Sequence, residues 1–215
     1  MDKKSILQAL EKLKKESKKR NFSQSVDLII TLKDLDLKNP DHQIDFFVNL
    51  HHSMNKKMKV CALVGPELAD ECKKVCDETI LSTQFIEYKE PRKAKSLAKK
   101  YDFFIAQASL MAQVASTFGR ALGPRGKMPN PKVGAIVVAK PQIKPLYEKL
   151  QQTVHLIAKK ETSIHVLVGK EDQEPEQLVD NIIYTYEQLI HHLPKEKNNI
   201  NSINLKLTMS KPVNI

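Results

Sequence analysis

The sequence predicts a mixed α/β fold. In it, a discontinuous α+β domain, residues 1–59 and 152–215, surrounds an inserted α/β domain at residues 60–151. Three observations predict this arrangement. Both ends of the chain combine strand-like segments with amphipathic helices, whereas the middle alternates short apolar strands with helices. A third is length, because 215 residues are enough for two small domains that each bury a core.

The two ends of the chain share a strand-and-helix character. From Ile6 to Leu13, apolar residues recur at helical spacing with lysines between them, which predicts an amphipathic helix. Residues 25–32 are rich in β-branched side chains, as strands are. The elements expected here are a helix at 3–18, strands at 25–32 and 44–50 around a loop at 33–43, a hairpin of strands 154–158 and 163–168, a helix at 175–193, and a strand at 203–207.

In the middle of the chain, glycine and proline mark the changes from strand to helix. Gly65 and Pro66 follow an apolar strand and open a helix, because proline is tolerated in a first helical turn. Ser109 is expected to cap a later helix. The expected elements are strands at 59–64, 84–88, 103–106 and 135–138, helices after 65 and 109 and at 92–100 and 145–152, and an irregular segment at 119–134. This alternation predicts a largely parallel sheet covered on both faces.

The composition indicates a basic, globular protein. Lys and Arg outnumber Asp and Glu by 35 to 25, and the sequence pI is about 9.4. The charge is segregated, since residues 103–147 contain no acidic residue whereas residues 161–196 contain eight. A basic excess favours a polyanionic partner such as nucleic acid. No apolar run approaches the roughly 20 residues that span a bilayer, so no membrane association is expected.

Cysteine usage and the N-terminal segment predict that the protein is located in the cytoplasm. The first twenty residues lack the apolar core of a signal peptide. Cys72 and Cys76 lie one helical turn apart with Cys61 near in sequence, but a cysteine zinc site needs four ligands at tighter spacing. We interpret all three cysteines as buried apolar side chains and expect no metal site. The histidine pairs at 51–52 and 191–192 are interpreted as surface residues that point apart.

Residues 119–134, GRALGPRGKMPNPKVG, form the strongest local motif. A nucleotide P-loop fails here, because Ala121 stands where the first glycine belongs and Met128 follows Lys127 in place of Ser or Thr. A dinucleotide-binding fingerprint is also missing. The segment therefore suits either a nucleic-acid backbone or plain solvent. Since no nucleophile elbow or paired carboxylates occur, we expect neither enzyme activity nor a cofactor.

Three segments resemble one known family. Residues 122–131, LGPRGKMPNP, are similar to the signature of the L-one family of large-subunit ribosomal proteins in its archaeal-like form. Residues 20–27 resemble the family's basic–Phe–x–x–Thr/Ser–Val–acid strand entry, and residues 199–202 with 207–212 resemble its C-terminal strand and Thr-Met-Gly turn. The matches follow the family's order along nearly the whole chain. The resemblance implies a split domain around a Rossmann-like insert, in agreement with the elements above.

The resemblance also implies that the split domain carries the main RNA site. The recognition patch would consist of Phe22, Ser25, Ser202, Thr208 and Met209, with Ser210 at its edge. Adjacent phosphate contacts are expected from Lys19, Arg20, Lys159 and Lys160, and a second set from the basic loop at Arg120, Arg125, Lys127 and Lys132. Without the resemblance, the hydroxyl residues would be interpreted as caps or turns and Phe22 as a core residue.

Two positions depart from the family pattern. Ser210 stands where the family usually has glycine, and Gln24 replaces a commonly acidic residue. If position 210 requires a positive φ, a serine there is strained and the turn differs.

The function implied by the resemblance is binding of large-subunit ribosomal RNA at the mobile stalk near the tRNA exit site. It further implies binding to a similar structure in the protein's own messenger RNA, which represses translation. Exit-site tRNA is a further candidate partner, and a monomer is expected off the ribosome. One alternative is a nucleotide-binding enzyme on the inserted α/β domain, which the broken P-loop disfavours. Another is a ribosome-biogenesis relative of the same fold, and such relatives often carry long charged extensions that this sequence does not show.

Overall fold

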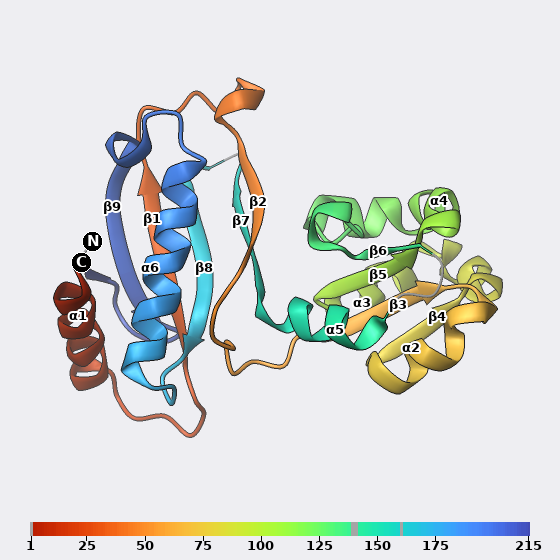
Figure 1. Ribbon diagram of the computed structural model, residues 1–215, viewed down its shortest axis with the longest axis horizontal. Helices are drawn as coiled ribbons and strands as arrows, with labels where there is room; N and C mark the ends of the chain where they lie inside the picture. Colours follow the sequence, from red (N-terminus) through yellow and green to blue (C-terminus); the bar gives the residue numbers. More distant parts are fainter. Residues whose placement is uncertain (1, 139–141, 160) are drawn as a thin grey trace. The chain divides into compact units, whose positions relative to one another are not determined.

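The computed structural model describes residues 2–138, 142–159 and 161–215 (Figure 1). Its mixed helices and sheets confirm the predicted α/β class. No helix within these ranges is long and apolar enough to cross a membrane.

The chain divides into two compact units. We call Met1–Lys56 with Gln152–Ile215 the split unit and Lys57–Gln151 the inserted unit. The first boundary lies just before the predicted one, because residues 57 and 58 bond within the inserted unit. Lys57 Nζ lies 3.0 Å from Asp77 Oδ1, and the Met58 N–H donates to Gln151 Oε1 at 2.8 Å.

The split unit is built on an antiparallel sheet in the order β10-β9-β1-β8. Its strands are β1 (Ser25–Leu32), β8 (Ser163–Lys170), β9 (Ile200–Leu207) and β10 (Val213–Asn214). Every second residue of β1 is buried, from Val26 to Leu32, because side chains alternate between the two faces of a strand. The predicted bounds of β1 are confirmed.

Two helices cover the buried face of this sheet. They are α1 (Lys3–Glu16) and α6 (Pro175–His191), and Figure 1 shows α6 lying along β1 and β8. Ile6 and Leu13 of α1 are buried, as are Leu178 and Ile182 of α6. The apolar spacing in the sequence therefore marks the packed face of each helix.

The strands that enter and leave the inserted unit form a sheet of their own. β2 (Ile44–Asn49) pairs antiparallel with β7 (Thr153–Ala158), whereas β8 pairs with β1. The predicted hairpin of 154–158 with 163–168 is therefore wrong. The two segments are close in sequence, which suggested that hairpin. After the inserted unit, however, the chain returns as β7 beside β2, the strand that leads into that unit. Phe46 of β2 stacks on His192 at the end of α6, with ring centroids 3.7 Å apart.

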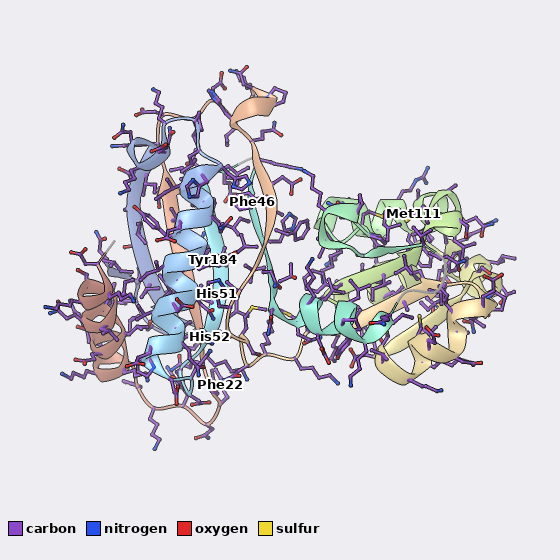
Figure 2. All side chains as sticks on the ribbon, viewed as in Figure 1. Phe22, Phe46, His51, His52, Met111 and Tyr184 are labelled. Atoms are coloured by element: carbon purple, nitrogen blue, oxygen red, sulfur yellow. The ribbon has the colours of Figure 1, made fainter. Side chains whose placement is uncertain are left out.

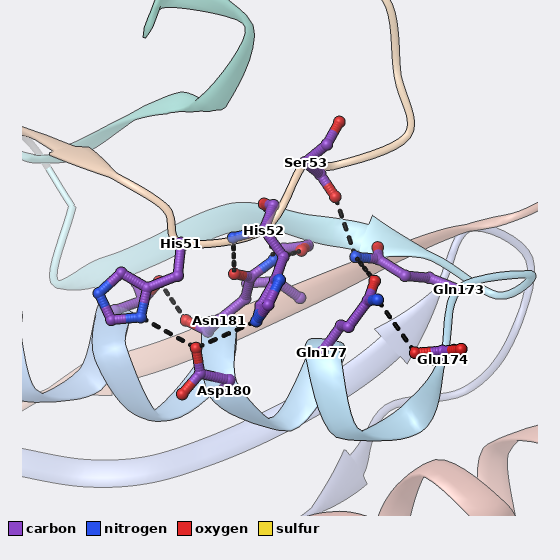
Figure 3. A network of polar contacts seen from close by, with 10 residues as sticks. His51, His52, Ser53, Gln173, Glu174, Gln177, Asp180 and Asn181 are labelled. Carbon is purple, nitrogen blue, oxygen red and sulfur yellow. Dashed lines mark hydrogen bonds and ion pairs between the residues drawn. The ribbon is translucent and has the colours of Figure 1, made fainter.

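The segment that follows β2 is fastened to α6 by buried amides (Figure 3). Asn181, fully buried, accepts a hydrogen bond from the His52 N–H at 3.1 Å and donates to the carbonyl oxygens of His52 and Val168. Gln173 Nε2 donates to the Ser53 carbonyl at 2.9 Å. These bonds satisfy backbone groups of Val168 in β8 and of His52 and Ser53, which lie outside any strand.

His51 and His52 meet at one carboxylate, contrary to the prediction that they point apart. His51 Nδ1 lies 2.9 Å and His52 Nε2 3.4 Å from Asp180 Oδ2 (Figure 3). The alternation of a strand or helix does not apply here, because residues 51–53 belong to neither.

The inserted unit contains a parallel sheet in the order β4-β3-β5-β6, which confirms the predicted parallel pairing. Its elements are β3 (Val60–Val64), α2 (Ala69–Val75), β4 (Glu78–Leu81), α3 (Pro91–Lys100), β5 (Phe103–Gln107), α4 (Met111–Leu122), β6 (Ile136–Val137) and α5 (Ile143–Gln152). Helices α3 and α4 pack side by side around the buried Phe118 and Leu97. Figure 1 shows α2 and α5 on the other side of the sheet.

Two local predictions in this unit are wrong. Residues 84–88 are part of the 3-10 helix η3 (Ser82–Lys89), not a strand. Phe85 and Tyr88 both reach Phe118, with centroids 5.4 and 5.5 Å away, because residues three apart share one side of a 3-10 helix. Ser109 lies inside the short 3-10 turn Ala108–Leu110 and does not cap α4.

The segment 119–134 is less irregular than predicted. α4 continues through its first four residues, because Ala121 and Leu122 are buried against the sheet. Beyond it lie the 3-10 turns η5 (Gly123–Arg125) and η6 (Pro131–Val133). Each turn ends on a glycine with positive φ, Gly126 at 65° and Gly134 at 81°, a conformation that other residues rarely adopt.

Candidate nucleic-acid interface

The predicted patch centres on the point where β1 begins and β9 ends. Ser25 and Thr208 lie opposite each other there because β1 and β9 are antiparallel, with Val26 paired to Leu207. The Ser25 N–H donates to Thr208 Oγ1 at 3.0 Å, and the Thr208 N–H donates to the Ser25 carbonyl at 3.1 Å. The two residues are therefore fixed to each other by one backbone hydrogen bond and by one that the Thr208 hydroxyl accepts.

Gln24, which departs from the family pattern, organises the turn beneath this pair. Its side chain is almost fully buried and donates to Ser17 Oγ and to Glu171 Oε2, at 3.0 and 3.2 Å. Gln24 Oε1 accepts the Met209 N–H at 3.2 Å. An amide can donate and accept at once, whereas a charged carboxylate can only accept. Gln24 therefore suits a site that already contains Glu171.

Ser210, the second departure, is not strained. It is absent from the described non-glycine residues with positive φ, which are Asp34, Asn55 and Glu196. Its Oγ accepts the Leu207 N–H at 2.9 Å, and its own N–H donates to the Leu207 carbonyl at 3.1 Å. The serine therefore closes the turn with its side chain.

Phe22 lies in the loop that precedes β1 (Figure 2), and Met209 lies in the turn that follows β9. Phe22 is 51% and Met209 60% exposed, which is unusual for side chains of this size. Phe22 is thus not the core residue that its type alone would suggest.

Basic residues surround a shallow pocket of about 400 Å³ beside Met209 and Ser210. Lys18, Arg20 and Lys211 line it, and Glu16 is its one acidic lining residue. The structure thus brings Arg20 to the patch as predicted, while Lys19 is exposed in the same loop between α1 and β1.

Ser202 lies on the same strand as the patch but at its other end. It pairs with Thr31 in β1, five residues from Leu207, which corresponds to about 17 Å at about 3.4 Å per residue. The side chains that alternate with the buried ones form what we call the outer face of the sheet. Its half-buried or exposed members are Ser25, Asp27, Ile29 and Thr31 of β1, Ser163, His165 and Leu167 of β8, and Ser202, Asn204 and Lys206 of β9.

Most residues of this outer face were not predicted from the sequence. The face contains a row of three hydroxyl residues, Ser163, Thr31 and Ser202, on neighbouring strands. The signal in the sequence was the alternation of polar with apolar residues in each strand, but the strand order was needed to align the rows. Burial raises the pKa of Asp27, the acidic residue on this face, although the charge of Lys206 opposes the shift.

Lys159 lies four residues before Ser163, whose partner in β1 is Thr31 at the Ser202 end of the patch, and its contact with a phosphate stays a prediction. It follows β7, and its Nζ forms an ion pair with Asp45 Oδ2 at 2.5 Å. Burial would raise the pKa of Asp45, but hydrogen bonds from Lys159 and His155 hold it below its usual value. Lys160 lies outside the described residues.

The basic loop of the inserted unit separates into exposed and internal cations. Arg120, Arg125 and Lys132 are exposed. Lys127 instead donates from Nζ to the carbonyl oxygens of Ala98 and Tyr101, at 3.1 and 2.7 Å. The interpretation of Lys127 as an RNA contact is therefore corrected to a structural role, because its ammonium group is bonded inside the unit.

One backbone N–H at the carboxyl ends of the parallel strands is already bonded within the unit. The Gly65 N–H after β3 donates to Gln107 Oε1 at the end of β5 at 2.9 Å, at the point where the strand order reverses. Doubly wound folds bind phosphates at that point with free backbone N–H groups. No group of three or more metal-ligating side chains occurs among the residues described.

Comparison with known proteins agrees with these features. The family description "Ribosomal protein L1p/L10e family" matches residues 13–211. Proteins named large ribosomal subunit protein uL1 are similar over nearly their whole length. In Pyrococcus horikoshii the identity is 38% over 218 residues, covering 100% of this chain and 96% of the relative. In Nanoarchaeum equitans it is 38% over 205 residues, covering 94% and 95%. In Methanobrevibacter smithii it is 36% over 212 residues, covering 98% of each. The chain therefore belongs to the Ribosomal protein L1p/L10e family.

Proposed function

We propose that the protein is a structural component of the large ribosomal subunit that binds ribosomal RNA through the split unit. The observation that carries this proposal is the exposed pair Phe22 and Met209 beside the fixed hydroxyl residues Ser25 and Thr208. The names of the relatives support the ribosomal location.

The hydroxyl groups suit recognition of ribose. Thr208 Oγ1 accepts from a backbone N–H, so the hydroxyl proton remains available for a ligand. A ribose 2′-OH both donates and accepts, which distinguishes RNA from DNA. Because the Thr208 backbone is itself bonded to Ser25, the hydroxyl is positioned before RNA arrives.

The exposed apolar side chains supply contact area. Phe22 can stack on a base or pack on a ribose, and stacking of one base contributes about 1–3 kcal/mol. Met209 is flexible and fits an irregular surface. Arg20 and Lys211 beside them would contact phosphates, which adds affinity and salt dependence without sequence choice.

The outer face extends the footprint of the RNA. The distance from Thr208 to Ser202, six residues or about 20 Å at about 3.4 Å per residue, is within reach of one RNA helix, whose wide minor groove displays a series of 2′-hydroxyl groups. We assign Ser202 and its neighbours Thr31 and Ser163 to the far end of this contact.

The finer function that we propose is the one implied by the family resemblance. The RNA is the stalk region of the large subunit near the tRNA exit site. The same surface binds a similar structure in the protein's own messenger RNA and represses its translation, and exit-site tRNA is a candidate partner of the inserted unit.

The test measures binding of wild type, Phe22→Ala and Thr208→Val to a stalk RNA transcript and to a scrambled duplex of equal length. The matched control is Ile86→Ala, which removes an apolar side chain, 71% exposed, from the inserted unit. We expect both patch variants to lose at least tenfold in affinity for stalk RNA alone, which is about 1.4 kcal/mol. A transcript of the protein's own messenger leader should compete for the same site.

Two outcomes would contradict the proposal. One is equal affinity of the wild type for stalk and scrambled RNA, which would leave only general attraction between charges. The other is a loss of affinity in Ile86→Ala as large as that in Phe22→Ala.

A further inference from the structure

A small basic pocket lies on the inserted unit between η3, α3 and α4. Its volume is about 180 Å³, and we call it the α3–α4 pocket. Three cations from three different elements line it: Lys89 at the end of η3, Lys95 on α3 and Arg120 on α4. The small side chains of Ala94 and Ala121 also line the pocket and leave room between the helices.

The three cations lack anionic partners. No acidic residue lines the pocket, and Glu90, close by in sequence, lies 3.5 Å from Lys93. Within the described part of the chain, Lys89, Lys95 and Arg120 form no ion pair with a carboxylate. Like charges that converge raise the local positive potential, which favours the entry of an anion.

The pocket also presents a hydrogen-bond donor. The hydroxyl of Ser116 donates to the Gln113 carbonyl at 2.9 Å, so its proton is already used. The half-buried Thr117 lines the pocket on the next position of α4. Its hydroxyl can donate to an anionic oxygen, and such charge-assisted bonds are stronger than neutral ones.

The size of the pocket restricts the ligand. Pockets for small molecules and cofactors usually measure about 300–1,000 Å³, so a whole nucleotide does not fit. The half-buried ring of Tyr88, the aromatic side chain that lines the pocket, already packs against Phe118, with centroids 5.5 Å apart. A single phosphate group with nothing to stack is the anion that matches these features.

We propose that the α3–α4 pocket binds one phosphate of an RNA backbone, in a contact separate from the patch on the split unit. The cations neutralise the phosphate and Thr117 donates to one of its oxygens. The exposed Arg125, just beyond α4, continues the basic surface for the neighbouring phosphates. The choice of RNA as the polymer rests on the proposed function, whereas the assignment of a phosphate rests on the pocket alone.

The test compares the triple variant Lys89→Gln, Lys95→Gln, Arg120→Gln of the full chain with a matched control. The control, Lys73→Gln, Lys74→Gln, Lys144→Gln, removes three exposed cations from α2 and α5 of the same unit. Affinity for the stalk transcript and for the scrambled duplex is measured across a range of salt concentrations. Thermal unfolding of each variant verifies that it folds.

We expect the pocket variant to lose roughly tenfold to hundredfold in affinity at about 0.1 M salt, and its salt slope to fall by about 2 relative to the control. The loss should be equal for both RNAs, because phosphate contacts carry no sequence choice. Thr117→Val should lose about threefold to tenfold with an unchanged slope, since it removes a hydrogen bond but no charge.

These outcomes separate the inference from the proposed function. Equal losses of RNA affinity in the pocket variant and the control variant would overturn the proposal that the α3–α4 pocket binds a phosphate. If inorganic phosphate raises the thermal unfolding temperature of the wild type but not of the pocket variant, while the pocket variant and the control bind RNA with equal affinity, the ligand is free phosphate and the RNA assignment is wrong. If Phe22→Ala binds stalk RNA normally while the pocket variant fails, the proposed recognition patch is wrong and the pocket stands.

Discussion

The split unit and the inserted unit both present cations to solvent, but the polar side chains on their surfaces are kept in position in different ways. In the split unit, the polar groups of the patch are bonded to backbone far away in the sequence, as between Ser25 and Thr208. In the inserted unit, Lys95 and Arg120 project from the exposed sides of two consecutive helices. Groups with fixed positions can discriminate among RNA shapes, whereas mobile cations mainly supply affinity. The first surface is therefore suited to recognition and the second to attachment.

The largest expected effect tests whether the split unit depends on its buried amides, since every fully or almost fully buried amide side chain among the described residues lies in this unit. Asn181→Leu removes one acceptor and two donated bonds from a fully buried site, which leaves backbone groups of His52 and Val168 without partners. We expect a loss of about 3 kcal/mol in the free energy of unfolding. Hydrogen exchange should accelerate in residues 1–56 and 152–215 and remain unchanged in 57–151.

Gln177→Leu is the control for this substitution. Its side chain bonds to Gln173 and Glu174 near the surface, so we expect a loss below about 1 kcal/mol. Equal destabilisation by the two variants would show that the buried position of Asn181 is not what matters.

The second effect separates structural from ligand-binding cations within the inserted unit. Lys127→Met removes the ammonium group that bonds to the carbonyl oxygens of Ala98 and Tyr101. It should lower the free energy of unfolding by about 2 kcal/mol. Arg125→Gln should leave stability unchanged and reduce the salt slope of RNA binding by about 1. Urea unfolding and binding titrations measure both effects. If Arg125→Gln lowers stability and Lys127→Met changes only RNA binding, the distinction between structural and ligand-binding cations is wrong.

The third effect concerns the turn after β9. Ser210→Gly restores the residue usual in the family but removes the Oγ that accepts the Leu207 N–H. Because Ser210 does not need a positive φ, glycine gains nothing there, and we expect a loss of about 1 kcal/mol in unfolding free energy. Ser210→Ala is the control that removes the hydroxyl without adding backbone freedom. Higher stability of the glycine variant would indicate strain at this position.

The smallest effect is a pH dependence on the outer face of the split unit. Burial raises the pKa of Asp27, so the folded protein holds this proton more tightly than the unfolded chain does. Its contribution to stability is complete below the usual aspartate pKa and is lost as pH rises through the raised value. Asp27→Asn should therefore stabilise the protein at pH 7 by up to about 1 kcal/mol, and not at pH about 3. Urea unfolding at both pH values measures the difference, and an equal effect at both would exclude the burial of charge as its cause.

Much of the fold could be predicted from local patterns. When a strand or helix buries one face, its apolar residues recur at the spacing of that element. The strand 25–32 was predicted with its observed bounds, and the parallel sheet of the inserted unit followed from the alternation of its elements. The segment 82–89 was missed, because a three-residue spacing of aromatics fits a 3-10 helix as well as a short apolar strand.

The candidate site was predicted in part. Phe22, Ser25, Thr208, Met209 and Arg20 gather at one end of the sheet, as the family resemblance implied. The sequence did not reveal that Lys127 bonds to carbonyl groups or that Lys159 pairs with Asp45. A lysine in a basic segment has the same pattern in either role, and only its neighbours in space distinguish the two.

The sequence by itself therefore predicted most of the elements, the two-domain organisation and the family. The tertiary structure decided which strands pair: β7 with β2, and β8 with β1. It also decided which side chains share the outer face and which cations converge on the α3–α4 pocket. The physical reason is that the spacing of apolar residues along the chain indicates the buried face of a single helix or strand. Pairing, partners and pockets depend instead on contacts between residues far apart in the chain.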